Sequence, residues 1–146
     1  ICIDGNDNML LNLARRRQCD VVGALVSSEA NASVAFIRGK DLGMTHVDTS
    51  LSGCPRGKRV LAKGGGGYCM GTSRLDDLLQ AAHAPRVIDF LSLDLEGHEE
   101  AVLSRFPFDI RYTIRALTIE RPKPALQELL LANKYTMALE TNGDQL

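Results

Sequence analysis

The sequence predicts an α/β domain built on a mainly parallel sheet. Segments of strand length alternate along the chain with segments of helical spacing, which is the pattern of strand–helix–strand units. The clearest strand is Val87–Leu93, an apolar run that suits a strand buried on both faces. Asp94 directly follows this run, and two other predicted strands end at Asp4 and at Glu120. Ligands bind at the carboxyl ends of strands in open α/β sheets. We therefore expect three carboxylates along one functional edge.

The first part of the chain contains three predicted strands and one helix. Residues 1–4 read as the end of a buried strand, and a polar turn then leads into a helix over 9–15 with arginines at its C-terminal end. Residues 20–26 form the second strand, and residues 33–37 form a third strand that we expect to be antiparallel.

The middle of the chain predicts a long loop. Residues 38–63 show no periodicity and contain Pro55 and scattered charges. Residues 64–67 are four consecutive glycines. Such a run could cradle a cofactor, but fingerprint glycines lie between a strand and a helix. Here a short apolar piece follows, at residues 68–70, so the glycines predict a flexible loop tip.

The second half alternates more regularly. A helix is predicted to begin after a cap at Thr72 or Ser73, with Asp76 completing a capping box, and to end before Pro85. The remaining predicted elements are a strand over 87–93, a helix over 98–105, a strand over 114–120, a helix over 125–133, a strand over 135–140 and a hairpin-type turn at 142–144.

The composition is that of one ordinary globular domain spanning residues 1–146. The chain is 45% hydrophobic and 24% charged, and its net charge of −1 creates no field that would attract nucleic acid or a membrane surface. Tryptophan is absent, and no apolar run reaches the about 20 residues of a membrane span. We expect no nucleic-acid partner and no membrane segment within the chain. Because the sequence starts within a strand and without methionine, we also expect it to be a piece of a longer protein.

The four cysteines do not predict a metal centre. They form no CxxC pair and lie near no histidine cluster, so we expect no zinc site. Cys2 and Cys19 fall in or beside predicted strands and are interpreted as small buried hydrophobic residues. Cys54 and Cys69 flank a loop-rich segment and could pair in an oxidising compartment. The glycosylation motif at residues 31–33 would matter only in a secreted chain.

The strongest resemblance to a known family lies around Asp94. Residues 94–99 read DLEGHE after the strand 88–93, and this stretch resembles the signature of FkbM-type methyltransferases, which use S-adenosylmethionine. Weaker similarity is found at residues 2–6, 17–19, 24–28, 102–103, 106–108, 117–122, 129–130 and 133–135. The resemblance covers most of the chain except about residues 39–68. Proteins of this family begin with a strand and a glycine-rich turn that holds the cofactor, and by this resemblance both would lie before Ile1.

The resemblance implies a Rossmann-like methyltransferase fold with helices on both faces of the sheet and with the first strand missing. It implies that the strands ending at Asp4 and Asp94 are parallel but not directly paired, at roughly 10 Å from each other, since adjacent strands lie about 4.8 Å apart. We expect such a partial domain to be inactive by itself.

The resemblance also implies roles for individual side chains. Asp4 would accept hydrogen bonds from the cofactor ribose, although an acid there could instead cap the next helix. Cofactor contacts are implied for Asp4, Asn6, Ser27 and Asp94, and catalytic roles for Asp94, Glu96 and His98. Asp94 would orient or deprotonate the acceptor hydroxyl, unless it is a buried acid that bonds the amides of its turn.

Other acidic residues near Asp94 have simpler interpretations. Glu99 and Glu100 fall in the first turn of a helix, where acids are favoured by the helix dipole, so they are expected to be structural. Glu120 ends a strand, but Arg121 beside it is equally consistent with a structural ion pair. His98 could face solvent at the start of its helix.

We therefore expect methyl transfer from S-adenosylmethionine to an oxygen of a sugar, lipid or small metabolite. One alternative is a transferase in which Asp94, Glu96 and Glu120 bind Mg²⁺ through oxygen ligands. Another is a methyltransferase-like module that does not catalyse a reaction and binds other proteins.

Overall fold

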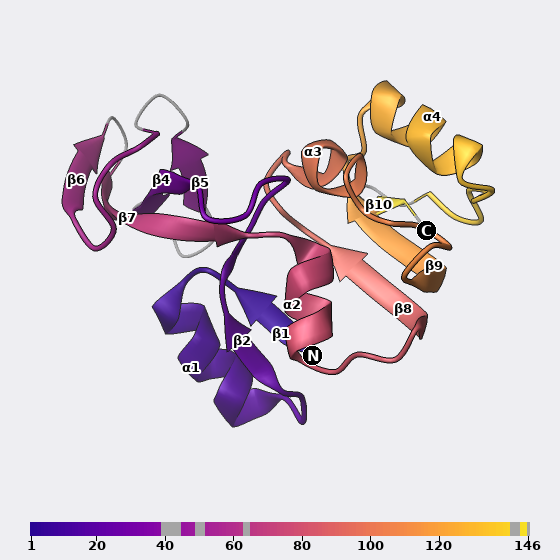
Figure 1. The fold of residues 1–146 in the computed structure, drawn as a ribbon, viewed down its shortest axis with the longest axis horizontal. Helices are drawn as coiled ribbons and strands as arrows, with labels where there is room; N and C mark the ends of the chain where they lie inside the picture. The colour runs from indigo at the N-terminus through magenta and orange to yellow at the C-terminus, as the bar shows by residue number, and fades with distance from the viewer. Residues whose placement is uncertain (39–44, 49–51, 63–64, 141–143, 146) are drawn as a thin grey trace. The chain divides into compact units, whose positions relative to one another are not determined.

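The chain folds into two compact units, Ile1–Arg74 and Leu75–Leu146. The computed structural model describes residues 1–38, 45–48, 52–62, 65–140 and 144–145. These residues form four helices and ten strands, and the strands lie in three separate sheets (Figure 1). The predicted α/β class is confirmed. A single, mainly parallel Rossmann-like sheet is not confirmed, because the ladders of the described residues remain separate.

The first unit holds most of the strands. Its elements are β1 (Cys2–Asp4), α1 (Asp7–Arg16), β2 (Val21–Gly23), β3 (Leu25–Val26), β4 (Ser33–Arg38), β5 (Thr45–Asp48), β6 (Arg59–Ala62) and β7 (Gly65–Ser73). β1 pairs in parallel with β2, and the other strands form a sheet around β7. β4 is antiparallel to β7, as the sequence predicted.

Helix α1 forms because its ends carry strong local signals. The Asn6 side chain caps the helix by accepting a hydrogen bond from the amide of Asn8 at 3.1 Å. Asp7 lies in the first turn, and Arg15 and Arg16 lie in the last turn, where each charge complements the helix dipole. The predicted helix is confirmed and is slightly longer than expected.

The long loop predicted for residues 38–63 is wrong in two places. β5 pairs with β4, and β6 pairs with β7. The predicted loop tip at the glycines is also wrong for residues 65–67, which belong to β7. A Cβ atom at Gly67 would overlap the carbonyl oxygen of Phe36 on β4. The glycine therefore permits a close approach of two backbones, which strand propensity does not reveal.

Thr72 does not have the capping role that the sequence suggested. It lies in β7, and its hydroxyl donates one hydrogen bond that is shared between the carbonyl oxygens of Glu29, at 2.6 Å, and Ala32, at 3.2 Å. Helix α2 (Leu75–Ala81) begins two residues after Ser73. The buried Thr72 hydroxyl therefore fastens the turn before β4 to the end of β7.

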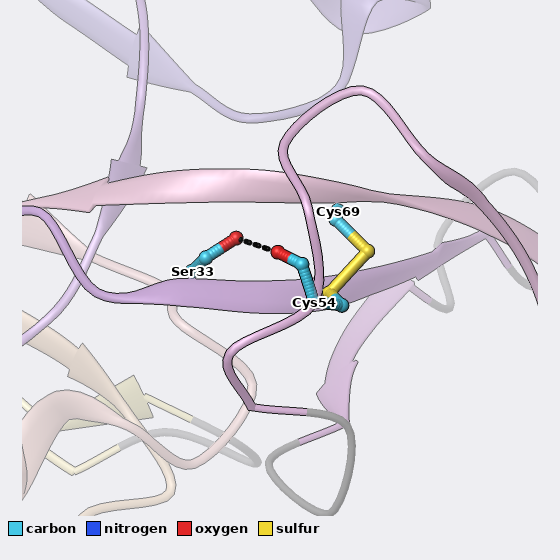
Figure 2. The surroundings of a disulfide bond; sticks show 3 residues. All are labelled: Ser33, Cys54 and Cys69. Atoms are coloured by element: carbon cyan, nitrogen blue, oxygen red, sulfur yellow. Dashed lines mark hydrogen bonds between the residues drawn. A yellow bond between two sulfur atoms is a disulfide. The ribbon is translucent and has the colours of Figure 1, made fainter.

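The cysteines form two disulfide bonds, both within the first unit. Cys2 is bonded to Cys19, so the interpretation of these two residues as separate buried hydrophobic residues is wrong. Cys54 is bonded to Cys69, the pairing that the sequence left open (Figure 2). Leu25, Val34 and Phe36 form the neighbouring hydrophobic core.

The second unit contains α2 and the strand–helix–strand segment around Asp94. Its other elements are β8 (Val87–Leu93), α3 (Glu99–Leu103), β9 (Thr113–Glu120), α4 (Pro124–Ala132) and β10 (Asp144–Gln145). β8 and β9 pair in parallel and lie side by side, and β10 is antiparallel to β9 (Figure 1). Ile119 and Leu126 are fully buried in this unit.

Two expectations for the second unit are wrong. Strand β8 is not buried on both faces, because Val87 is 43% exposed and Phe90 is 55% exposed. β9 is its only ladder partner among the described residues. Residues 135–139 do not form the predicted strand; the Tyr135 hydroxyl instead donates to the carbonyl oxygen of Ile114 at 2.8 Å. Of the predicted turn at 142–144, residues 142–143 lie outside the described part.

Candidate functional site

The turn that follows β8 is held by a buried carboxylate. The Oε1 atom of Glu99 accepts hydrogen bonds from the backbone amides of Leu95, at 2.6 Å, and Gly97, at 3.3 Å. Glu99 is only 5% exposed, so its carboxylate makes these charge-assisted bonds largely shielded from solvent. Glu96 and Gly97 both adopt positive φ angles, +53° and +95°, which produce the sharp turn into α3. Glu99 therefore has the structural role expected from the sequence.

Asp94 is left exposed by this arrangement. The alternative that Asp94 is the buried acid that bonds the turn's amides does not hold, because Glu99 bonds two of those amides. The carboxylate of Asp94 lies at the carboxyl end of β8, where the parallel ladder pairs Leu93 with Ile119 of β9. Asp94 and Glu120 thus follow paired positions of adjacent strands, and the expectation that they share one edge is confirmed.

Asp94 and Glu120 form a carboxyl pair. The pKa of Glu120 is raised, mainly by a side-chain hydrogen bond with Asp94 and by the negative charge of Asp94. The charge of Glu96 adds to this effect, whereas the guanidinium of Arg121 opposes it. Arg121 lies 3.3 Å from the Glu120 carboxylate, so both interpretations of Glu120 apply: it forms an ion pair and it belongs to the carboxyl edge.

This arrangement can hold and accept a proton. Two carboxyl groups that lie close together titrate as a pair, since ionisation of one disfavours ionisation of the other. A carboxylate beside a second negative charge binds a proton more tightly than an isolated one. The pair can therefore accept a proton from a hydroxyl placed at the strand ends. The sequence predicted the edge, but not the influence of Asp94 on the pKa of Glu120.

His98 occupies the N-cap position of α3 and is partly buried. Its side chain makes no capping hydrogen bond. No described contact joins its ring to Asp94 or Glu120. Its predicted catalytic role therefore stays a prediction.

The carboxylates do not form a metal centre among the described residues. No three His, Cys, Asp or Glu side chains of this part of the chain are arranged so that they could hold a metal ion. Asp94, Glu96 and Glu120 therefore do not provide the predicted Mg²⁺ site as they are arranged.

Two predicted cofactor residues of the first unit, Asp4 and Asn6, lie where β1 leads into α1. The Oδ1 atom of Asp4 accepts a hydrogen bond from the amide of Asn6 at 2.7 Å, and Asn6 itself caps α1. Asp4 is therefore not the helix cap but the residue that orients the cap. Ser27 follows β3, and its amide donates to the carbonyl oxygen of Ser73 at 2.9 Å.

These residues and the carboxyl pair belong to different units of the chain. β1 and β8 lie in different sheets, so no ladder pairs them, as expected. The predicted common edge for Asp4 and Asp94, and the spacing of their strands, stay predictions.

The second unit also contains a cavity that sequence reasoning did not find. It has a volume of about 390 Å³ and lies between β9, α4 and the segment after α4. Most of its lining is apolar, and its side chains include Leu117, Ile119, Leu130, Tyr135 and Met137. Burial raises the pKa of the Tyr135 hydroxyl, and the charge of Asp109 adds to this shift. The lining comes from distant segments, so no single stretch of sequence indicates the cavity.

Alternating strands and helices with acids at the strand ends define an α/β protein with a carboxylate site. The family model described as the methyltransferase FkbM domain matches residues 9–139, and the chain therefore belongs to the FkbM methyltransferase family. The resemblance seen in the sequence is thus confirmed. The match includes Ser27, Asp94, Glu96 and His98, and it begins after Asp4 and Asn6.

Searches against curated proteins and against solved structures found no match. None of the helices in the described part of the chain has the length and apolarity of a membrane span.

Proposed function

We propose that this protein transfers a methyl group from S-adenosylmethionine to an oxygen atom of a sugar, a lipid or a small metabolite. Membership of the FkbM methyltransferase family supports the reaction class. The observation that carries the proposal is the carboxyl pair of Asp94 and Glu120 at the ends of two adjacent parallel strands. Such a pair suits the removal of a proton from a hydroxyl acceptor.

Asp4 is the residue we assign to the cofactor. Its Oδ1 atom is used by the amide of Asn6, and no described hydrogen bond uses its Oδ2 atom. This oxygen lies on a partly buried residue at the end of β1 and can accept a hydrogen bond from a ribose hydroxyl. Asn6, which caps α1, and Ser27, which follows β3, would complete the contacts. These residues therefore fit a nucleoside ligand.

Asp94 is the residue we assign to the acceptor. S-adenosylmethionine, when bound, supplies a methyl group activated by a positively charged sulfur. The Asp94 carboxylate would accept a hydrogen bond from the acceptor hydroxyl and hold its oxygen in line with the methyl group. It would then take the proton as the new carbon–oxygen bond forms. Glu120 would lie beside the acceptor hydroxyl as a second carboxyl group, and its own pKa is raised by Asp94.

A Rossmann-like arrangement is part of this proposal. The parallel ladders β1–β2 and β8–β9 support it, since Asp4 is the last residue of β1 and Asp94 directly follows β8. In that arrangement, Asp4 and Asp94 lie at the same edge of one sheet. An experimental structure of the full-length protein that places the two acids at opposite edges would contradict it.

The test compares two conservative variants of the full-length protein. Asp94→Asn should lower methyl transfer by about 100-fold or more, the usual contribution of a positioned base, while cofactor affinity changes little. Asp4→Asn should weaken binding of S-adenosylmethionine by about 1–3 kcal/mol through loss of charge-assisted hydrogen bonds. Calorimetric titration and a turnover assay measure the two effects separately.

Asp89→Asn is the matched control. Asp89 lies on β8, the strand that ends just before Asp94. Its Oδ1 atom forms an exposed ion pair with the Nη1 atom of Arg115 at 2.7 Å. Its removal should leave turnover unchanged, because exposed ion pairs contribute little. Normal turnover by a folded Asp94→Asn variant would make the Asp94 carboxylate structural and move the base to Glu96 or His98. A folded full-length protein that binds no S-adenosylmethionine would favour the interaction module.

A further inference from the structure

We propose that Asn31 carries an N-linked oligosaccharide, added while the protein folds in an oxidising secretory compartment. Residues 31–33 read Asn-Ala-Ser, the acceptor motif for such a glycan. No other Asn-X-Ser or Asn-X-Thr triplet occurs in the 146 residues.

The disulfides indicate the kind of compartment in which the protein folds. All four cysteines are bonded, Cys2 to Cys19 and Cys54 to Cys69, and none is free. Both pairs have Cα atoms 6.0 Å apart, which is the ordinary separation for a disulfide. Disulfides of this kind persist in secreted proteins and are rare in reducing compartments. Two independent pairs therefore indicate the same environment that glycosylation requires.

The position of Asn31 fits a glycan. Asn31 is exposed in the turn between β3 and β4, with a φ of +61°, a conformation that asparagine tolerates. The Arg56 guanidinium donates to its carbonyl oxygen at 3.3 Å and to its Oδ1 atom at 3.4 Å. The Nδ2 atom, to which the sugar would be joined, has no hydrogen bond among the described residues. A glycan on Nδ2 would thus leave the described contacts of Asn31 in place.

The chemistry is a group transfer from a lipid-linked oligosaccharide. The Nδ2 atom of Asn31 forms a bond to the anomeric carbon of the first sugar. The bond from that carbon to the oxygen of a polyprenyl pyrophosphate breaks, and the lipid pyrophosphate leaves. The proton lost from the amide passes to a base of the transferase. No oxidant or reductant takes part in this step.

The structure also sets the order of events. The Ser33 hydroxyl donates a hydrogen bond to the carbonyl oxygen of Cys54 at 2.5 Å, beside the disulfide to Cys69 (Figure 2). Ser33 is also the first residue of β4 and lies opposite Gly71 of β7. A transferase that reads the serine hydroxyl would first have to break this hydrogen bond. We therefore expect the sugar to be added before the Cys54–Cys69 disulfide closes this region.

One peptide of the full-length protein, isolated from its own cells, tests both the glycan on Asn31 and the disulfide at Cys19. Trypsin releases residues 18–38 as a single peptide, because no Lys or Arg lies between Arg17 and Arg38, and this peptide holds both Cys19 and Asn31. We expect Cys19 to react with an alkylating reagent only after reduction. We expect Asn31 to carry a sugar that peptide N-glycosidase removes, leaving aspartate that mass spectrometry detects.

Variants expressed in the same cells define the site. Asn31→Gln and Ser33→Ala should abolish the glycan, and Ser33→Thr should retain it, since threonine also completes the motif. Asn133→Gln is the control, because Asn133 lies in no such motif, and it should leave the glycan unchanged. Replacing Cys54 and Cys69 with serine should raise the glycosylated fraction of Asn31.

Three results would overturn the proposal. The first is an unmodified Asn31 in protein whose Cys19 is oxidised. The second is a Cys19 that is alkylated without prior reduction, which would exclude the oxidising compartment. The third, a glycosylated fraction that is unchanged in the Cys54 and Cys69 variant, would overturn the proposed order of addition and disulfide closure.

Discussion

Replacing Glu99 with alanine should destabilise the protein by removing the anchor of the turn after β8. The lost contacts are the 2.6 Å bond from the Leu95 amide and the weaker 3.3 Å bond from the Gly97 amide. A hydrogen bond to a charged group contributes about 1.5–3 kcal/mol. Water can replace part of the lost bonding at the exposed side of the turn. We therefore expect the free energy of unfolding of the full-length protein to fall by about 2–3 kcal/mol.

Glu100→Ala is the matched control for this prediction. Glu100 lies in the same first turn of α3, so both variants lose the same favourable interaction with the helix dipole, about 0.3–1 kcal/mol. Glu99→Gln should fall between the two, because a neutral acceptor forms a hydrogen bond of roughly half the strength. Urea unfolding followed by circular dichroism measures the difference. A Glu99→Ala variant no less stable than Glu100→Ala would refute the assignment of Glu99 as the anchor.

Three further predictions concern the carboxyl pair, the disulfide and the core. The raised pKa of Glu120 means that its contribution to stability is present at acidic pH and is lost as the pH rises through that pKa, because Glu120 then ionises beside Asp94. Glu120→Gln should therefore raise the unfolding temperature at pH 7 more than at pH 4; a larger gain at pH 4 would contradict this sign. Replacing Cys54 and Cys69 with serine removes a crosslink between residues 15 positions apart in the sequence. The free energy of unfolding, measured in urea under oxidising conditions, should then fall by about 3 kcal/mol, and an unchanged value would refute the crosslink. Leu126→Ala should cost about 2–5 kcal/mol because Leu126 is 1% exposed, whereas the 62% exposed Leu131 should tolerate alanine; equal losses would show that α4 packs differently.

Elements with local signals could be predicted from the sequence. Asn6 and Pro124 mark the starts of α1 and α4, because a cap and a first-turn proline act within a few residues. β5 and β6 were missed because their pairing depends on distant strands. Gly67 was misread for the same reason, since its role is set by the approach of Phe36.

The candidate site was predicted only in part. Asp94 and Glu120 could be found because each follows or ends an apolar run at the carboxyl end of a strand. Their closeness could not be predicted, since it depends on the register of β8 on β9. The Cys2–Cys19 bond and the apolar cavity beside Tyr135 likewise arise from the three-dimensional arrangement.

The disulfides divide the molecule into a redox-sensitive part and a redox-insensitive part. All four cysteines lie in the unit that contains Asp4, and the Cys2–Cys19 bond begins within β1 itself. The unit that contains Asp94 and Glu120 has no cysteine. A reductant would therefore break the crosslinks of the unit that contains Asp4, to which we assign the methyl donor. It would leave the unit that contains Asp94, to which we assign the acceptor, chemically unchanged. Under reducing conditions, donor affinity would decline before acceptor recognition does.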